Sequence, residues 1–303
     1  MGMTTGIVTI DKPEGLTSQG VVGRVRRLFE QKSVGHGGTL DPMATGVLPV
    51  FLGRATRASS YALEGDKTYA ARFRFGISTD TQDITGRTLA VCARIPARDE
   101  IAAVLPRFTG EISQVPPMYS AIQKDGQRLY DLARRGIEVE REARRVVIHA
   151  LKTLSADESP FGEAGEDELD VVVTCSKGTY IRTLCADIGD ALGCGAAMAA
   201  LRRLKTGAFT LENAYTLDAL EKMKENGTLG EAVRPCDLLF AELPALTLDA
   251  EGEARIRRGA PVYLMRPAGR YRLYGPAGGF LGLGVVRETD RRPELTIEKG
   301  MME

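Results

Sequence analysis

The stretch Ser33-Val-Gly-His-Gly-Gly-Thr-Leu-Asp-Pro-Met-Ala-Thr-Gly46 stands directly before an apolar run from Val47 to Leu52. The apolar run predicts a buried strand, because it is short, hydrophobic and bounded by turn residues. A loop this rich in glycine, placed between two regular elements, is either a tight connection or a place where another backbone comes close. The loop also carries a carboxylate, Asp41, which is either a turn residue or part of a functional site.

Upstream of this loop, the segment GIVTIDKP predicts a short strand that ends at Pro13, since proline cannot continue a central ladder. A helix is expected next, with Thr17 or Ser18 as its N-cap. Its apolar residues fall on one helical face, and they are Val21, Val22, Val25, Leu28 and Phe29.

Downstream, strict alternation from Tyr69 to Ile77 places Arg72 and Arg74 on the polar face and predicts a half-buried strand. The β-branched run from residue 171 to 174 predicts a buried strand. The segment 176–182 leads into a helix, and we expect a polar, helical stretch from there to about residue 240. Beyond residue 245, short apolar runs separated by glycine and proline predict a small all-β module.

Charge is distributed unevenly along a chain of 303 residues whose formal net charge is zero. Residues 1–155 carry 22 basic and 16 acidic side chains, or +6, whereas residues 156–303 carry 18 and 24, or −6. The stretch 156–170 holds seven acids and no base, and it is a candidate for a face turned away from an anionic partner. At roughly 150 residues per domain, the length predicts two domains.

Several function classes are excluded by composition. Five cysteines without a C-x-x-C pair fit neither a disulfide framework nor a zinc ribbon, and they indicate reduced thiols in the cytoplasm. His36 and His149 are the only histidines, so a multi-histidine metal site is impossible. No run approaches the about 20 apolar residues of a membrane span, and no phosphate-binding G-x-x-x-x-G-K-[ST] loop occurs. An enzyme of this composition is expected to work without metal, nucleotide or redox cofactor.

Three motifs stand out, namely Lys12-Pro-Glu-Gly-Leu-Thr-Ser18, the run from Gly35 to Pro49, and Lys177-Gly-Thr-Tyr-Ile-Arg182. Each has an ordinary structural explanation when it is taken alone. K-P-x-G is a turn between strand and helix, and a loop aspartate such as Asp41 is more often a turn residue than a catalytic one. Tyr69 by itself fits a core tyrosine at a strand end.

In combination, these motifs are much more specific. Together with Lys67-Thr-Tyr69, Phe75-Gly76 and Leu201-Arg-Arg-Leu-Lys-Thr-Gly207, they stand in the order typical of one family, and the chain resembles the TruB family of pseudouridine synthases over essentially its whole length. The resemblance implies an α/β (α+β) catalytic domain, with a mixed, largely antiparallel sheet flanked by helices, and a small β-rich PUA-like domain. It implies an RNA-modifying isomerase without a cofactor.

The resemblance also assigns catalytic roles. Asp41 corresponds to the essential aspartate, which acts as a nucleophile or as electrostatic stabiliser of an oxocarbenium-like state. Arg182 matches the arginine that pairs with it, since a nearby cation favours the ionised carboxylate where burial opposes it. Tyr69 matches the tyrosine that packs on the target base.

Further residues are expected to bind RNA or support the pocket. His36 would stack where a flipped nucleotide has left its loop, and Lys12 would support the pocket with a possible phosphate contact. Tyr180 would contact the pocket interior. The remaining expected contacts are Gly38, Thr39, Leu201, Lys124, Arg128 and Arg144.

The expected partner is the T-arm of tRNA, bound by a monomer that needs no guide RNA and no membrane. Residues 1–240 would form the catalytic domain, with a basic insertion at about 106–145 that closes over the RNA, and residues 241–303 the PUA-like RNA-binding domain. Taken alone, the basic insertion could equally be a solvated helical face. The C-terminal module could equally be a structural cap. A guide-dependent or ribosomal RNA synthase with the same site, and a tRNA-folding protein with secondary catalysis, remain alternatives.

Overall fold

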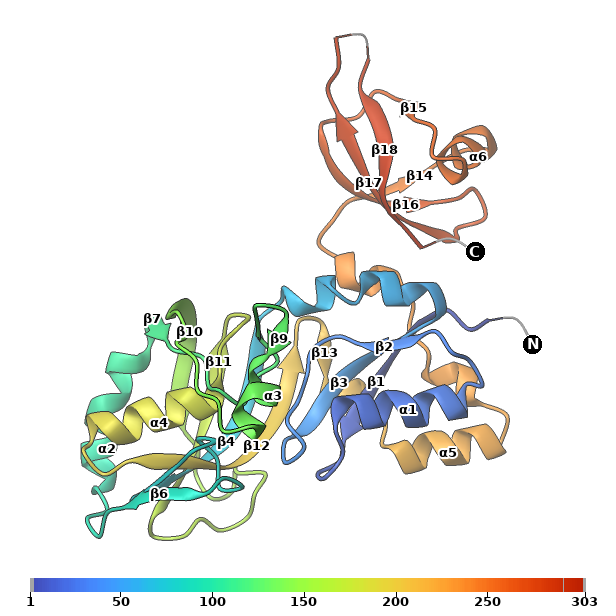
Figure 1. Cartoon of the computed structure of the whole chain (residues 1–303). Helices are drawn as coiled ribbons and strands as arrows, with labels where there is room; N and C mark the ends of the chain where they lie inside the picture. Colours follow the sequence, from blue (N-terminus) through green and yellow to red (C-terminus); the bar gives the residue numbers. More distant parts are fainter. Residues whose placement is uncertain (1–2, 291, 302–303) are drawn as a thin grey trace. The chain divides into compact units, whose positions relative to one another are not determined.

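The computed structural model describes residues 3–290 and 292–301, which form two compact units (Figure 1). The first unit comprises Met1–Pro42, Val47–Glu64 and Gly207–Glu303, and the second comprises Met43–Gly46 and Gly65–Thr206. The glycine-rich stretch is therefore divided. Its residues up to Pro42 belong to one unit, and the next four belong to the other.

The first unit contains an N-terminal α/β part and a C-terminal β-rich part. In chain order its strands and helices are β1 (Gly6–Lys12), α1 (Ser18–Leu28), β2 (Val34–His36), most of β3 (Thr45–Leu52), β13 (Phe209–Thr210), α5 (Leu217–Glu225), β14 (Ala245–Thr247), α6 (Ala250–Arg257), β15 (Val262–Tyr263), β16 (Gly269–Tyr274), β17 (Phe280–Arg287) and β18 (Glu294–Gly300). Short 3-10 segments lie at Gly53–Ala58, Tyr61–Leu63, Leu211–Asn213, Leu229–Ala232 and Cys236–Phe240.

Strand β1 ends at the residue before Pro13, as expected, and apolar side chains cover both of its faces. Val8 and Ile10 pack with residues of α1, β3 and α5, while Ile7 joins a second cluster that includes Phe51. Burial on both faces explains why β3 reads as a nearly continuous apolar run rather than an alternating one.

Helix α1 begins as predicted and resolves the choice of cap. The side-chain oxygen of Thr17 accepts a hydrogen bond from the Gly20 N–H at 2.9 Å, so Thr17 is the N-cap. Val21, Val22 and Val25 are buried on the face that packs against the sheet. Ser18 is consequently available for a different interaction.

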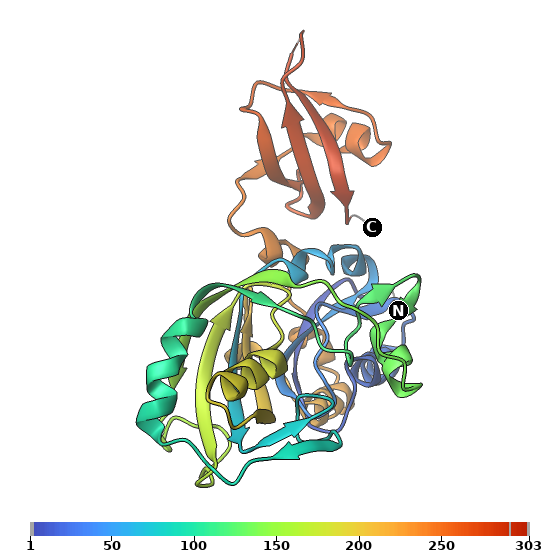
Figure 2. The ribbon, with the colours of Figure 1, turned by 60° about the vertical axis from the view of Figure 1, so that its left-hand side comes forward.

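The second unit is built on a curved sheet with helices and hairpins around it. Its strands and helices are β4 (Lys67–Phe75), β5 (Ile77–Thr79), β6 (Thr88–Val91), α2 (Arg98–Val104), β7 (Gly110–Gln114), β8 (Gln123–Lys124), β9 (Gln127–Arg128), α3 (Leu129–Arg134), β10 (Arg144–Thr153), β11 (Glu168–Cys175), α4 (Ile181–Ala191) and β12 (Ala196–Thr206), with a 3-10 segment at Leu105–Phe108. Helix α4 packs against β12 and β4 (Figures 1 and 2).

Hydrogen bonds join the main strands in the order β1-β3-β12-β4-β11-β10-β7. The pairs β12–β4, β4–β11, β11–β10 and β10–β7 are antiparallel, whereas β12 runs parallel to the first residues of β3. The expected mixed, largely antiparallel sheet flanked by helices is therefore confirmed.

The prediction of helix from the end of α4 to about residue 240 is wrong for residues 196–206. This segment, AAMAALRRLKT, is the strand β12. Alanine, leucine, arginine and lysine favour helix in isolation, but the segment lies between β4 and β3, where ladder pairing outweighs local propensity. Helix is found later, in α5.

Strand β4 is not half-buried as predicted, because both of its faces are covered. Arg72 is only 9% exposed and forms a two-pronged contact with Asp170 of β11, with Nε–Oδ1 at 2.7 Å and Nη2–Oδ2 at 2.8 Å. Arg74 pairs with Asp167 at 2.8 Å. Asp170 of the acidic stretch 156–170 thus neutralises a buried arginine, whereas the pair of Arg74 and Asp167 remains accessible to solvent.

The C-terminal β-rich part is confirmed, with a five-stranded order of β14-β16-β17-β18-β15. Its core contains Leu273, Val286 and Leu295 on neighbouring strands. Helix α6 was not anticipated by the all-β prediction, although Asp249 caps it by accepting from the Gly252 N–H at 2.7 Å. Its alternating charges hide the short apolar stripe that ends at Ile256.

No helix in the described part of the chain is long and apolar enough to cross a membrane. All five cysteines are free thiols. Burial raises the pKa of Cys175 to about 11 and that of Cys236 to about 12, so neither is a thiolate near neutral pH. Among residues 3–290 and 292–301, no three His, Cys, Asp or Glu side chains are grouped to hold a metal ion.

Asp187 on α4 provides a stability test. Desolvation, and then Asp190, raise the pKa of Asp187 from 3.8 to about 6. A raised carboxyl pKa favours the folded state only while the group is protonated, so this contribution is lost between about pH 4 and pH 6. Asp187→Asn is expected to raise the free energy of unfolding at pH 7.5 by about 1 kcal/mol after allowing for solvent screening, and to change little at pH 4.

Denaturant unfolding at the two pH values measures this effect. Asp190→Asn is the matched control and should stabilise less, because Asp190 is exposed and is the smaller cause of the shift. If Asp187→Asn stabilised the protein equally at both pH values, the raised pKa of Asp187 would be contradicted.

Candidate active site

The loop around Asp41 is held by the first sequence motif. Ser18 Oγ donates to the Leu40 carbonyl at 3.1 Å and accepts from the Leu40 N–H at 2.8 Å. On the other side of Asp41, the Pro42 carbonyl accepts from the Gly15 N–H at 2.9 Å. The residues before and after Asp41 are thus both held by hydrogen bonds to the first motif, which explains why the two motifs occur together.

The Lys12 side chain also holds the loop around Asp41. It is completely buried, and Nζ donates to the carbonyl oxygens of Pro13 at 2.8 Å, Leu16 at 2.6 Å and Pro42 at 3.2 Å. Three acceptors match the three protons of an ammonium group, so the buried charge is satisfied by backbone dipoles. The expected role of Lys12 in supporting the pocket stays a prediction.

Gly46 ends the glycine-rich stretch at a point of close backbone approach. Its φ is +100°, and a Cβ built there would lie 2.2 Å from the Arg203 carbonyl oxygen. Gly46 and Thr45 pair in parallel with Arg203 and Arg202 of β12. Of the two interpretations left open for this loop, close approach of another backbone is therefore realised at Gly46.

The other expected residues of this loop lie at its start. His36 ends β2, opposite Val50 of β3, and is partly buried. Gly38 has a φ of +110°, and Thr39 is exposed. The RNA contacts expected of His36, Gly38 and Thr39 stay predictions.

Tyr69 and Leu201 lie on the same face of the second unit's sheet. In β4, Tyr69 stands opposite Arg203 of β12 and Val173 of β11. Leu201 stands opposite Ala71, two residues along β4, so it is a diagonal neighbour of Tyr69. Tyr69 is 9% exposed and Leu201 is 7% exposed.

Arg182 is buried in the first turn of α4, although a cation there opposes the helix dipole. It is 5% exposed, and its guanidinium donates to the carbonyls of Thr81 at 3.0 Å and Tyr119 at 2.9 Å. Nη1 also lies 3.8 Å from Asp83 Oδ2. These acceptors stabilise a buried guanidinium at a helix N-terminus, where both burial and the helix dipole disfavour a positive charge.

Asp83 is a site residue that the sequence analysis missed. It is 5% exposed, and its Oδ1 accepts from the Thr81 hydroxyl at 2.8 Å and the Thr85 N–H at 2.9 Å. The signal available was the density of Thr and Asp in the segment 79–86, which is typical of a turn stabilised by its own side chains.

Tyr180 precedes α4 and is fixed through its backbone. Its N–H donates to Gln114 Oε1 at 3.1 Å, and its carbonyl accepts from Gln114 Nε2 at 3.3 Å. The end of β7 thereby sets where α4 begins, and with it the position of Arg182.

The basic insertion has a small core of its own. Met118, Leu129 and Leu132 are buried together. Lys124 on β8 donates to the Glu140 carbonyl at 2.7 Å, and the guanidinium of Arg128 lies 5.8 Å from the ring centroid of Tyr130. Arg144 lies apart from this hairpin, at the start of β10. All three expected RNA-binding cations are exposed.

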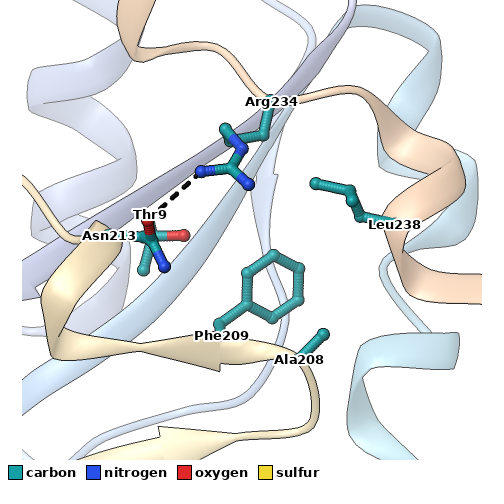
Figure 3. A pocket seen from close by; sticks show the side chains of 6 residues that line it. All are labelled: Thr9, Ala208, Phe209, Asn213, Arg234 and Leu238. Atoms are coloured by element: carbon teal, nitrogen blue, oxygen red, sulfur yellow. Dashed lines mark hydrogen bonds between the residues drawn. The ribbon is translucent and has the colours of Figure 1, made fainter. Parts of the chain in front are cut away.

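A small cavity of about 60 Å³ lies in the first unit (Figure 3). Arg234 points toward Asn213 there, with Nη1 to Oδ1 at 3.3 Å, and Thr9, Ala208, Phe209 and Leu238 complete the lining. Sites for small molecules usually measure about 300 to 1,000 Å³, so this cavity holds a few waters rather than a nucleoside.

The candidate site residues are distributed over the two units. Lys12, His36 and Asp41 belong to the first, whereas Tyr69 and Arg182 belong to the second. The pairing of Asp41 with Arg182 therefore stays a prediction.

Comparison with known families defines the class of this protein. Residues 26–181 match the N-terminal domain of the TruB family of pseudouridylate synthases. Residues 182–241 match the C-terminal domain of tRNA pseudouridylate synthase B, and residues 244–291 match the C-terminal domain of pseudouridine synthase II TruB. The chain belongs to the TruB family, and it is an isomerase that forms pseudouridine.

Similar proteins span nearly the whole chain. The tRNA pseudouridine synthase B of Dechloromonas aromatica (strain RCB) is 44% identical over 280 residues, covering 92% of this chain and 90% of that protein. The protein of the same name from Ralstonia nicotianae is 44% identical over 299 residues, covering 96% and 94%. The solved structure described as a Cbf5-Nop10-Gar1 complex matches with a TM-score of 0.71 and 27% identity, covering 98% of this chain and 85% of that one.

Removal of the Ser18 hydroxyl tests the support of Asp41. Ser18→Ala leaves the Leu40 N–H and carbonyl without their partner, so we expect turnover to fall about tenfold to a hundredfold while the protein stays folded. Thr17→Ala is the control. It removes the helix cap and should cost about 1 kcal/mol of stability while preserving turnover. Equal turnover of the two variants would contradict the role of Ser18.

Proposed function

We propose that this chain converts the T-loop uridine at position 55 of tRNA to pseudouridine, as a monomer in the cytoplasm and without a guide RNA. The observation that carries the proposal is 44% identity to proteins named tRNA pseudouridine synthase B over more than nine-tenths of the chain. Identity to the Cbf5 complex is only 27%, which favours the free-standing tRNA enzyme over the guide-dependent alternative.

The proposed chemistry is an isomerisation. The bond between uracil N1 and ribose C1′ breaks, the base turns, C5 bonds to C1′, and the proton of C5 is replaced by one on N1. Atoms and electrons balance without an oxidant or an added group. The enzyme must reach the sugar and both faces of the base, so the nucleotide has to leave its loop.

In this proposal Asp41 is the nucleophile at the ribose or the stabiliser of its positive charge, and Arg182 keeps it ionised. Tyr69 and Leu201 contact the base from the sheet, and His36 occupies the space that the base has left. The rigid support of the Asp41 loop favours these roles, since a reacting carboxylate must be held in place.

The RNA-binding surface is proposed to include the exposed cations Lys124, Arg128 and Arg144. The domain boundary at 240/241 is part of the same proposal, with residues 241–303 as a PUA-like RNA-binding module. Two family matches end and begin nearby, at residues 241 and 244, which supports this division.

Replacement of Asp41 tests the catalytic assignment. Asp41→Asn keeps the size and polarity of the side chain but removes its charge, so pseudouridine formation in a T-arm transcript without any guide should fall below detection. Retained turnover in a folded variant would refute the assignment. An inactive Asp41→Asn protein that still rescues a growth defect would instead favour RNA folding as the selected role.

Salt dependence tests the binding surface. Binding through phosphate contacts weakens with salt in proportion to the number of ions released. Replacing Lys124, Arg128 and Arg144 together by Ala should flatten the plot of log Kd against log salt by roughly two units. Replacing the exposed Arg27, Lys32 and Lys222 is a control of equal charge. An equal change in slope for both triple variants would contradict the proposed surface.

A further inference from the structure

The turn between β5 and β6 supplies two acceptors to Arg182. These are the carbonyl of Thr81 at 3.0 Å and the carboxylate of Asp83 at 3.8 Å. Gln82 lies between Thr81 and Asp83 in the sequence. Its backbone conformation therefore sets the direction in which both neighbours point.

Gln82 has a left-handed backbone, with a φ of +63°. A side chain other than glycine rarely adopts this region, so the conformation persists only where surrounding contacts enforce it. The Gln82 N–H donates to the Thr79 carbonyl at 3.3 Å, and its carbonyl accepts from the Met198 N–H at 3.0 Å. The strained residue is thus fixed to β12 at its backbone.

The Gln82 side chain is fixed to α4. Its Oε1 accepts a hydrogen bond from the hydroxyl of Thr183 at 2.8 Å. Thr183 is 2% exposed and directly follows Arg182. A buried hydrogen bond therefore connects the residue between the two acceptors to the residue beside the arginine that they hold.

We propose that Gln82 and Thr183 form a positioning pair, which locks the 79–85 turn against α4 and thereby orients the guanidinium of Arg182 for the isomerisation. This inference rests on the proposed role of Arg182. The pair acts through Arg182 and makes no contact with the substrate. The proposal gives a reason for the left-handed backbone of Gln82. Packing of a half-buried glutamine does not by itself require that conformation.

A double-mutant cycle tests the pair. Thr183→Val is nearly isosteric and removes only the donor, whereas Gln82→Gly accepts the left-handed φ and removes only the side chain. Each variant should lower the single-turnover rate on saturating T-arm RNA by roughly tenfold, with the RNA Kd changed less than twofold. The double variant should be no slower than the slower single variant. Thr183→Ser keeps the hydroxyl and should restore most of the rate.

Control variants separate a failure of the positioning pair from a failure of the proposed role of Arg182. Thr210→Val removes a buried hydroxyl that has no hydrogen-bond partner and should leave the rate unchanged. If Arg182→Lys retains the full rate, the role of Arg182 itself is wrong. If Arg182→Lys is slow but Thr183→Val and Gln82→Gly react at the wild-type rate, or their effects multiply, the positioning pair is refuted. Gln82→Gly decides the question if Thr183→Val fails to fold.

Discussion

The bonds of the buried Lys12 ammonium to three backbone carbonyls are the constraint on which the Asp41 loop depends. They join the end of β1, the start of α1 and the residue after Asp41. Because one ammonium group bonds all three carbonyls, the strand end, the helix start and the loop are linked to a single buried charge. Ser18 then adds the bond on the other side of Asp41. The residues on both sides of the partly exposed Asp41 are thereby held by hydrogen bonds.

Much of the fold follows from local patterns. β1 ends where Pro13 requires it, Thr17 caps α1, and the helix expected from the segment 176–182 is found as α4. These features depend on residues close together in sequence, which is why a single sequence reveals them. The motif order likewise points to the family, because several motifs must serve one site.

Features that depend on distant partners could not be predicted. β12 has a helix-favouring composition and becomes a strand only because β4 and β3 flank it. Arg72 alternates like a solvent-facing residue, yet Asp170, 98 positions away, allows it to be buried. Asp83 contacts Arg182 and Gln82 contacts Thr183, both on α4, and nothing in the sequence around residues 82 and 83 reveals those distant partners.

The division of each unit into separate stretches of chain bears on how the protein is synthesised. The first unit draws on Met1–Pro42, Val47–Glu64 and Gly207–Glu303, so it lacks its last segment until the second unit's sequence has been translated. Domains usually fold as they emerge from the ribosome. Here β1 and α1 must wait for α5, whose Leu217 and Leu220 complete their apolar cluster. Neither unit exists as a continuous fragment, and a nascent chain stopped before residue 207 exposes an unfinished core.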